Sequence, residues 1–191
     1  MNPTILFEDP HLVVLSKPAG LLSQGEKTGE PNLVDWCRAH FGRNYVGLVH
    51  RLDRFTSGLL VVAKRSKSAE RLTRALRDGE LVRAYLAILE GEVPAPAEWR
   101  HLLKKDPSTN TTAVSRPGVP GAKEAVLFVR PISTIPVSGG RRLTLAEFEL
   151  ETGRSHQIRV QSSAMGHPLL GDSKYGSRFS DLGFPRPGLH S

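Results

Sequence analysis

The chain carries one aspartate among several basic residues, on a loop that runs directly into an apolar segment. Asp53 lies between Arg51 and Arg54, and the loop ends at Gly58. Residues 59–63 are an unbroken apolar run, which predicts a fully buried strand. Nearby cations favour the ionised form of a carboxyl group, so we expect Asp53 to be charged at neutral pH. A charged aspartate on a rigid loop is a candidate nucleophile. The alternative is a structural aspartate that caps its loop or pairs with an arginine.

The order of residues around Asp53 resembles the central motif of the RluA-type pseudouridine synthases. The run His-Arg-Leu-Asp at residues 50–53 is followed by Thr-Ser-Gly-Leu-Leu at residues 56–60 and the apolar run. In that family the aspartate of the Arg-Leu-Asp triplet is the nucleophile, which the resemblance assigns to Asp53. His50 favours the RluA type over the sister RsuA type, in which glycine usually precedes Arg-Leu-Asp. Phe55 stands where an acidic residue is common, and we expect it to alter the loop surface rather than the chemistry.

Two further segments carry the resemblance on either side of this motif. Lys-Pro-Ala-Gly-Leu at residues 17–21 opens the catalytic domain in the family and implies that Lys17 lies beside the cleft. A solvated strand end is the alternative for Lys17. Residues 80–91 read as a strand, and Tyr85 within it matches the tyrosine of the family motif Lys-x-Tyr-x-Ala, with Arg83 in place of lysine. The resemblance implies that Tyr85 packs against the target base, for which a tyrosine offers a flat apolar face and a hydroxyl group.

The next motif is Gly-Arg-Ser-His-Gln-Ile-Arg at residues 153–159, which we expect to open a short helix ending near Gly166. His156 and Arg159 are three residues apart and would share a face of that helix. The resemblance implies that Arg159 pairs with the catalytic aspartate, and a planar guanidinium suits a carboxylate. Gly-Asp-Ser-Lys-Tyr-Gly at residues 171–176 also resembles a family segment that lies near the cleft.

The resemblance thus implies two sets of site residues. The expected catalytic residues are Asp53, Tyr85 and Arg159. The expected substrate and RNA-binding residues are Lys17, His50, Arg51, Arg54, Arg154 and His156. A uridine would be flipped out of its stack, with His50 and Arg51 filling the space it leaves. Asp53 would promote cleavage of the glycosidic bond, by attack on the sugar or through a glycal, before uracil rotates and rejoins through C5.

This isomerisation requires no metal and no cofactor, and we expect neither. The sequence has no metal-ligand cluster and no glycine-rich phosphate-binding motif. One alternative is a catalytically inactive RNA-binding protein of the same fold. Another is a carboxylate-based glycosidase or nuclease, which needs a second acid or a metal. The other acids considered occupy contexts that indicate no such partner; they are Asp106, Glu149, Glu151 and Asp172.

The composition favours a polyanionic partner. The chain has 191 residues, with 26 lysines and arginines against 19 acidic residues, a formal charge of +7. This surplus predicts a polyanionic partner such as nucleic acid; a basic protein with no such partner is the alternative. The resemblance implies that the partner is RNA, either rRNA or tRNA. The single cysteine, Cys37, excludes an internal disulfide and a Cys-based zinc cluster, and we expect it to be buried. With no signal-like or membrane-spanning segment in the sequence, we expect a cytoplasmic monomer without a membrane partner.

The elements that must position these residues read as an α/β (α+β) fold. We expect one pseudouridine synthase catalytic domain over residues 1–191, with a mixed, mainly antiparallel sheet, flanking helices and a central cleft. Two short strands flank an Asp-Pro turn before residue 17, helices cover about 32–41 and 66–78, and later strands include 123–131 and 143–151. We expect no N-terminal S4-type domain and a shortened C-terminal end. The arginines of the second helix favour a solvated face over phosphate contacts; they are Arg71, Arg74 and Arg77.

Overall fold

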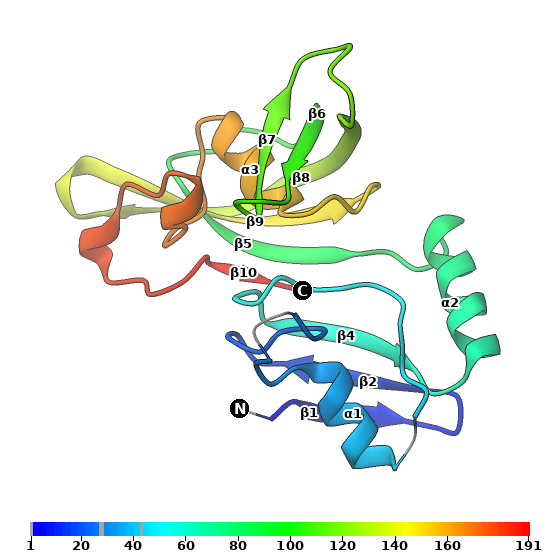
Figure 1. Ribbon diagram of the computed structural model, residues 1–191. Helices are drawn as coiled ribbons and strands as arrows, with labels where there is room; N and C mark the ends of the chain where they lie inside the picture. Colours follow the sequence, from blue (N-terminus) through cyan, green and yellow to red (C-terminus); the bar gives the residue numbers. More distant parts are fainter. Residues whose placement is uncertain (1, 27–28, 43) are drawn as a thin grey trace. The chain divides into compact units, whose positions relative to one another are not determined.

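The structure is a computed structural model, and it describes residues 2–26, 29–42 and 44–191. The chain forms two compact units (Figure 1). The first runs from the N-terminus to Val82 and includes the last two residues, and the second comprises Arg83–Leu189. Each unit is built around its own sheet. The predicted α/β class and antiparallel strand pairing are confirmed, with two sheets where the sequence suggested one.

The first unit contains a four-stranded sheet in the order β1-β2-β4-β3, with antiparallel neighbours. Its elements are β1 (Thr4–Glu8), β2 (Leu12–Lys17), α1 (Leu33–Phe41), β3 (Gly47–Leu48), β4 (Gly58–Ala63) and α2 (Ser66–Arg77). The side chain of Asp9 accepts hydrogen bonds from the amides of His11 and Leu12, both at 2.7 Å, which forms the predicted turn between β1 and β2. β2 pairs with β4 so that Lys17 lies opposite Gly58. The Lys-Pro-Ala-Gly-Leu loop therefore leaves the sheet beside the end of the Asp53 loop.

Helix α1 matches the predicted range and cap. The side chain of Asn32 accepts a hydrogen bond from the Asp35 amide at 3.1 Å, and Gly42 ends the helix in a left-handed conformation. Leu33 and Cys37 are buried. Burial raises the pKa of the Cys37 thiol to about 11. The expectation of a buried cysteine is confirmed.

The second unit contains a six-stranded sheet in the order β10-β5-β9-β8-β6-β7. Its strands and principal helix are β5 (Ala84–Glu90), β6 (Ala97–Asp106), β7 (Thr111–Ser115), β8 (Lys123–Val137), β9 (Arg141–Leu150), α3 (Gln157–Ala164) and β10 (Leu189–His190), of which His190 is counted with the first unit. Short 3-10 turns lie at Ser138–Gly140, Ser173–Tyr175 and Ser180–Leu182. The first of these joins β8 to β9 and is the predicted hairpin turn, in which Gly139 and Gly140 have φ values of 74° and 69°. The strands predicted over residues 80–91, 123–131 and 143–151 are confirmed as β5, β8 and β9, although their ends differ from the predicted ones.

Helix α3 is buried over most of its length, including the polar side chains of Gln157, Arg159, Gln161 and Ser162. Gln161 stands in its middle and is fully buried. Its Nε2 donates to the carbonyl oxygen of Trp99 at 2.9 Å and lies 3.0 Å from Nδ1 of His101. The glutamine therefore ties the helix to strand β6.

The His101 contact predicts a dependence of stability on pH. Burial lowers the pKa of His101 below its usual 6.5, so the unfolded chain takes up a proton at a higher pH than the folded one. The stabilisation that neutral His101 contributes to the folded state is complete above pH 6.5. It is lost as the pH falls through the lower pKa that His101 has in the folded protein. We expect thermal unfolding of the wild type to shift down between about pH 7 and about pH 5 more than that of His101→Gln. Parallel shifts for the two proteins would contradict this role.

Within the described part of the chain, no helix is long and apolar enough to cross a membrane.

Candidate functional site

The loop that carries Asp53 is fixed by Ser23, which lies 29 positions before its hydrogen-bond partner Leu52 in the sequence. Ser23 Oγ donates to the carbonyl oxygen of Leu52 at 2.7 Å and accepts from the amide of Leu52 at 3.1 Å. Ser23 and Leu52 are both buried, whereas Asp53 is half-buried. On the other side, the Thr56 amide donates to the carbonyl oxygen of Asp53 at 3.1 Å. The main chain is thus held immediately before and after the Asp53 side chain.

Replacing Ser23 with alanine should therefore disturb both stability and the aspartate. We expect a loss of about 1–3 kcal/mol in the free energy of unfolding, because the buried Leu52 amide and carbonyl lose their partner. We also expect a lower kcat for the reaction proposed below with little change in KM, because the Asp53 backbone loosens. Ser162→Ala is the matched control, since Ser162 Oγ is buried and has no hydrogen-bond partner in the described structure. Equal losses of stability and of kcat in Ser23→Ala and Ser162→Ala would show that the Ser23 hydroxyl does not hold the Asp53 loop.

Lys17 is fully buried at the end of β2, so its reading as a solvated strand end is wrong. Its Nζ donates to the carbonyl oxygens of Pro18 at 3.1 Å, Leu21 at 2.8 Å and Arg54 at 3.2 Å. An ammonium group has three N–H donors, which suits three carbonyl oxygens. The amide of Gly20 also donates to the Arg54 carbonyl, at 2.8 Å. Lys17 therefore fastens the Lys-Pro-Ala-Gly-Leu loop to the Asp53 loop.

The two arginines that flank Asp53 have different surroundings. Arg54 makes a bidentate ion pair with Glu30, at 3.1 and 2.6 Å, and its Nε donates to the carbonyl oxygen of Gly20 at 3.3 Å. It also lies over the ring of the exposed Phe55. Arg51 is exposed and makes no hydrogen bond or ion pair with the residues that the structure describes. Arg54 therefore links loops of the first unit, while Arg51 presents its charge to solvent.

His50 lies against the edge of β4. Its Nε2 accepts a hydrogen bond from the amide of Val61 at 3.3 Å, just beyond the point where β3 stops pairing with β4. An imidazole nitrogen that accepts must have its lone pair available, so Nε2 carries no proton in this contact. The imidazole thereby extends the hydrogen bonding of the strand edge and anchors the start of the Asp53 loop.

The last two residues of the chain hold the other end of this loop. The Ser191 amide donates to the Ser57 carbonyl, and the Leu59 amide donates to the Ser191 carbonyl, both at 2.9 Å. His190 Nδ1 lies 3.0 Å from Ser57 Oγ. Gly58 has a φ of 120°, and a Cβ there would collide with the Ser191 backbone, so only glycine fits. The motif glycine is thus required by close packing against the C-terminal residues.

In the second unit Arg159 forms a buried ion pair that sequence reasoning missed. Its Nε and Nη2 donate to the two carboxylate oxygens of Asp172 at 2.6 and 2.8 Å. The side chains are 8% and 1% exposed. A guanidinium has five N–H donors, and this pair uses two of them. The position of Asp172 in the Gly-Asp-x-x-Tyr-Gly segment is the signal in the sequence that could have identified this partner.

Tyr175 connects Arg159 with His156. The Arg159 guanidinium lies 4.8 Å from the centre of the Tyr175 ring, and the Tyr175 hydroxyl is 2.6 Å from Nδ1 of His156. The Thr112 amide also donates to this hydroxyl, at 2.9 Å. His156 lies at the N-cap of α3 with a φ of 55°, so it precedes the helix instead of sharing a helical face with Arg159. The prediction that the two residues share a helical face is therefore wrong, and Tyr175 contacts both of them instead.

Tyr85 lies on the buried face of the second sheet, opposite Phe148 of β9, and is 7% exposed. The nearby Arg83 donates from Nη2 to the carbonyl oxygens of Leu150 at 3.3 Å and Glu151 at 3.0 Å. Burial lowers the pKa of Arg83. The arginine that replaces the usual lysine therefore joins the start of β5 to the end of β9.

Arg154 is anchored beside the start of α3. Its Nε donates to the carbonyl oxygen of Glu124 at 2.7 Å, and its amide donates to Oε1 of Gln157 at 2.9 Å. Gln157 in turn donates from Nε2 to the Val126 carbonyl at 3.0 Å. These bonds connect the Gly-Arg-Ser-His-Gln segment to strand β8.

The predicted site residues thus fall into two groups, each built within one unit. The first unit holds Lys17, His50, Arg51, Asp53 and Arg54, and the second holds Tyr85, Arg154, His156 and Arg159. Among the described residues, no group of three or more His, Cys, Asp and Glu side chains could bind a metal ion.

The fold defines a class of protein. A solved structure of Human RNA Pseudouridylate Synthase Domain Containing 1 matches 99% of this chain with a TM-score of 0.78 and 25% identity, over 76% of that chain. Residues 11–164 match the model of the family described as RNA pseudouridylate synthase. The chain therefore belongs to the RNA pseudouridylate synthase family, and the resemblance read from the sequence is confirmed.

Curated relatives are similar over most of this chain. "Uncharacterized RNA pseudouridine synthase YhcT" of Bacillus subtilis is 38% identical over 178 residues, which are 90% of this chain and 57% of that protein. "Ribosomal large subunit pseudouridine synthase D" of Zymomonas mobilis is 35% identical over 209 residues, 98% of this chain and 62% of that protein. The chain thus spans about 57–62% of the length of these relatives.

Proposed function

We propose that this protein isomerises uridine to pseudouridine in RNA, with Asp53 as the nucleophile. The observation that carries the proposal is the Asp53 loop, which lies within the matched family segment and is held by Ser23 and Lys17. Such a loop keeps a reactive carboxylate in one place, and catalysis gains from a fixed geometry. Family membership supports this activity over that of a binding protein.

The reaction conserves every atom of the nucleotide. Asp53 promotes breakage of the C1′–N1 bond, either by attacking C1′ or by taking a sugar proton to form a glycal, and the bonding electrons leave with uracil. The uracil rotates and C5 forms a new bond to C1′. In the first route this bond displaces the Asp53 carboxylate from C1′, and in the second Asp53 returns the proton to the sugar carbon. The proton on C5 is then released and N1 regains one. In both routes the Asp53 carboxylate is the one side chain that reacts with the sugar, as a nucleophile or as a base.

We assign Tyr85 and Arg159 to the support of this carboxylate and of the base. Tyr85 packs against the flipped uracil, with its hydroxyl available for proton transfer. We assign Arg159 a role with Asp53 in the reaction, and Asp172 fixes its guanidinium through two hydrogen bonds. Lys17 acts by holding the Asp53 loop, and His156 acts through Tyr175 on Arg159.

Recognition of RNA falls to the remaining basic residues. His50 and Arg51 occupy the space vacated by the flipped base, and Arg54 and Arg154 lie beside the bound strand. We propose rRNA or tRNA as the substrate; the Zymomonas mobilis relative is named for the large ribosomal subunit. The exposed charge of Arg51 and the net charge of +7 support an RNA partner. We further propose that the protein acts as a monomer in the cytoplasm, which suits its unpaired, buried Cys37.

Base-resolved pseudouridine mapping of total cellular RNA tests the activity. Cells that express wild type, Asp53→Asn or Asp181→Asn are compared, the last being an exposed control. We expect one or more sites present with wild type and Asp181→Asn and missing with Asp53→Asn. If the three maps are identical and purified protein binds transcripts without modifying them, the catalytic proposal fails and the RNA-binding alternative replaces it.

A further inference from the structure

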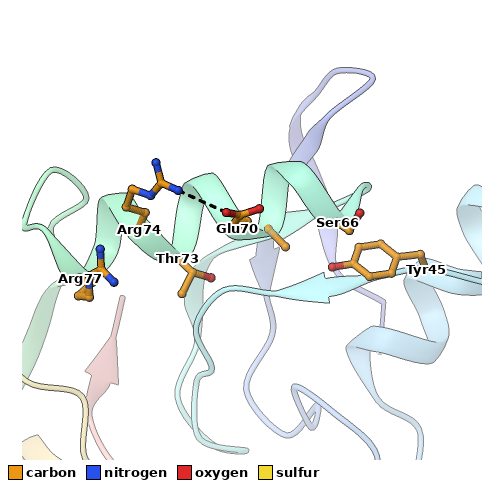
Figure 2. Close-up of a pocket in the computed structure, with 7 residues that line it drawn as sticks. Tyr45, Ser66, Glu70, Thr73, Arg74 and Arg77 are labelled. Carbon is orange, nitrogen blue, oxygen red and sulfur yellow. Dashed lines mark hydrogen bonds and ion pairs between the residues drawn. The ribbon is translucent and has the colours of Figure 1, made fainter.

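One face of helix α2, outside the residues assigned above, forms the wall of a polar pocket. Figure 2 shows this pocket, which has a volume of about 400 Å³ and is lined by the first unit alone. The lining residues are Tyr45, Ser66, Ala69, Glu70, Thr73, Arg74 and Arg77. Those on α2 recur at helical spacing along its whole length, so they form one stripe. Twelve residues of helix rise about 18 Å, enough to follow several nucleotides of a strand.

The chemistry of this stripe suits a phosphate backbone rather than an apolar partner. Three hydroxyl groups line it, from Tyr45, Ser66 and Thr73, and Arg74 and Arg77 add two positive charges against the one carboxylate of Glu70. Hydroxyl and guanidinium groups donate hydrogen bonds to phosphate oxygens. The pocket lining contains no large aliphatic side chain that would anchor a protein partner.

The ion pairs that Arg74 and Arg77 make within the protein do not prevent them from binding phosphate. Arg74 pairs with Glu70 at 3.3 Å, and Arg77 pairs with Asp78 at 3.0 Å. The four side chains are 43–74% exposed, and such pairs contribute little because water screens them. Both arginines lie in the last turn, where they also favour the helix dipole. That function explains their charge but not the three hydroxyl groups beside them.

We propose that this stripe, which we call the α2 groove, is a docking site for the phosphate backbone of the RNA substrate. The proposal rests on the function proposed above, because it assigns part of the substrate to a second surface. Arg74 and Arg77 neutralise phosphates there, Thr73 and Ser66 donate hydrogen bonds, and Tyr45 borders the strand. Glu70 opposes binding, since its carboxylate repels the phosphates and competes for Arg74.

Fluorescence anisotropy with a fluorescein-labelled oligouridylate tests the groove. All variants are made in the Asp53→Asn background, so that conversion of the RNA does not enter the measurement. We expect Arg74→Gln/Arg77→Gln to weaken binding about ten-fold at low salt and to reduce the salt slope of the affinity by about 1.4, which corresponds to two fewer phosphate contacts on a single strand. We expect Glu70→Gln to tighten binding.

The matched control is Arg100→Gln/Arg130→Gln, which removes the same charge from exposed ion pairs in the second unit. We expect a smaller loss of affinity and an almost unchanged salt slope. If the groove and control variants behave alike, or if Glu70→Gln weakens binding, the groove proposal is overturned. Circular dichroism verifies that α2 remains folded. If the groove pattern holds while wild-type protein converts no uridine, the proposed function fails and the docking site remains.

Discussion

Asp172→Asn is expected to lower the free energy of unfolding of the second unit by about 3–5 kcal/mol, the usual result of breaking a buried ion pair from one side. The substitution conserves shape but removes the buried carboxylate that accepts two hydrogen bonds from the Arg159 guanidinium, which is 8% exposed. Chemical denaturation followed by tryptophan fluorescence measures the change. Trp99 is buried in the second unit and Trp36 lies in the first, so a Trp36→Phe background reports the second unit alone.

Asp181→Asn is the control for this substitution, because Asp181 also makes a bidentate pair with an arginine. Its bonds to Arg141 are 2.7 and 2.6 Å long, but its side chain is 57% exposed. We expect only a small change in stability, since water screens the pair. We also expect Asp172→Asn to slow the proposed isomerisation, because Arg159 would no longer be oriented. Similar unfolding curves for Asp172→Asn and Asp181→Asn would contradict the structural role of the buried pair.

Glu90→Gln should have the second largest effect, on the order of 3 kcal/mol of unfolding free energy. The Glu90 carboxylate is fully buried and accepts from the Ser177 hydroxyl at 2.6 Å and from the amides of Arg178 and Phe179 at 2.9–3.0 Å. A glutamine amide group would place N–H donors against some of these donors and would remove the charge that strengthens the bonds. The same tryptophan-based denaturation experiment measures the loss.

Glu92→Gln controls for the loss of a glutamate two positions away. Glu92 pairs with Arg142 at 3.2 Å and is 53% exposed, so its replacement should be nearly neutral. We expect Glu90→Gln also to increase protease cleavage within residues 177–179, because the carboxylate holds that segment to β5. Equal stability of the Glu90 and Glu92 variants would contradict the role of the buried carboxylate.

The sequence by itself determined the local elements and the family. The helix over residues 32–41 was predictable because its cap and apolar spacing are encoded within one short segment. The hairpin at Ser138–Gly140 was predictable because glycines favour its backbone angles. The Asp53 motif could be recognised for the same reason, since all its residues are contiguous. That Asp53, Tyr85 and Arg159 act together on one uridine stays a prediction.

Only the tertiary structure decided which residues hold the site in place. The Ser23 contact with Leu52 spans 29 positions, the Lys17 contact with Arg54 spans 37, and Arg159 meets Asp172 13 positions away. Apolar periodicity predicts which positions are buried. It does not predict which polar group tertiary packing will bring close enough to form hydrogen bonds with the buried polar groups there. Lys17 illustrates the limit, because an isolated lysine at a strand end is ordinarily solvated. Its burial follows from three carbonyl oxygens that converge only when separate loops pack together.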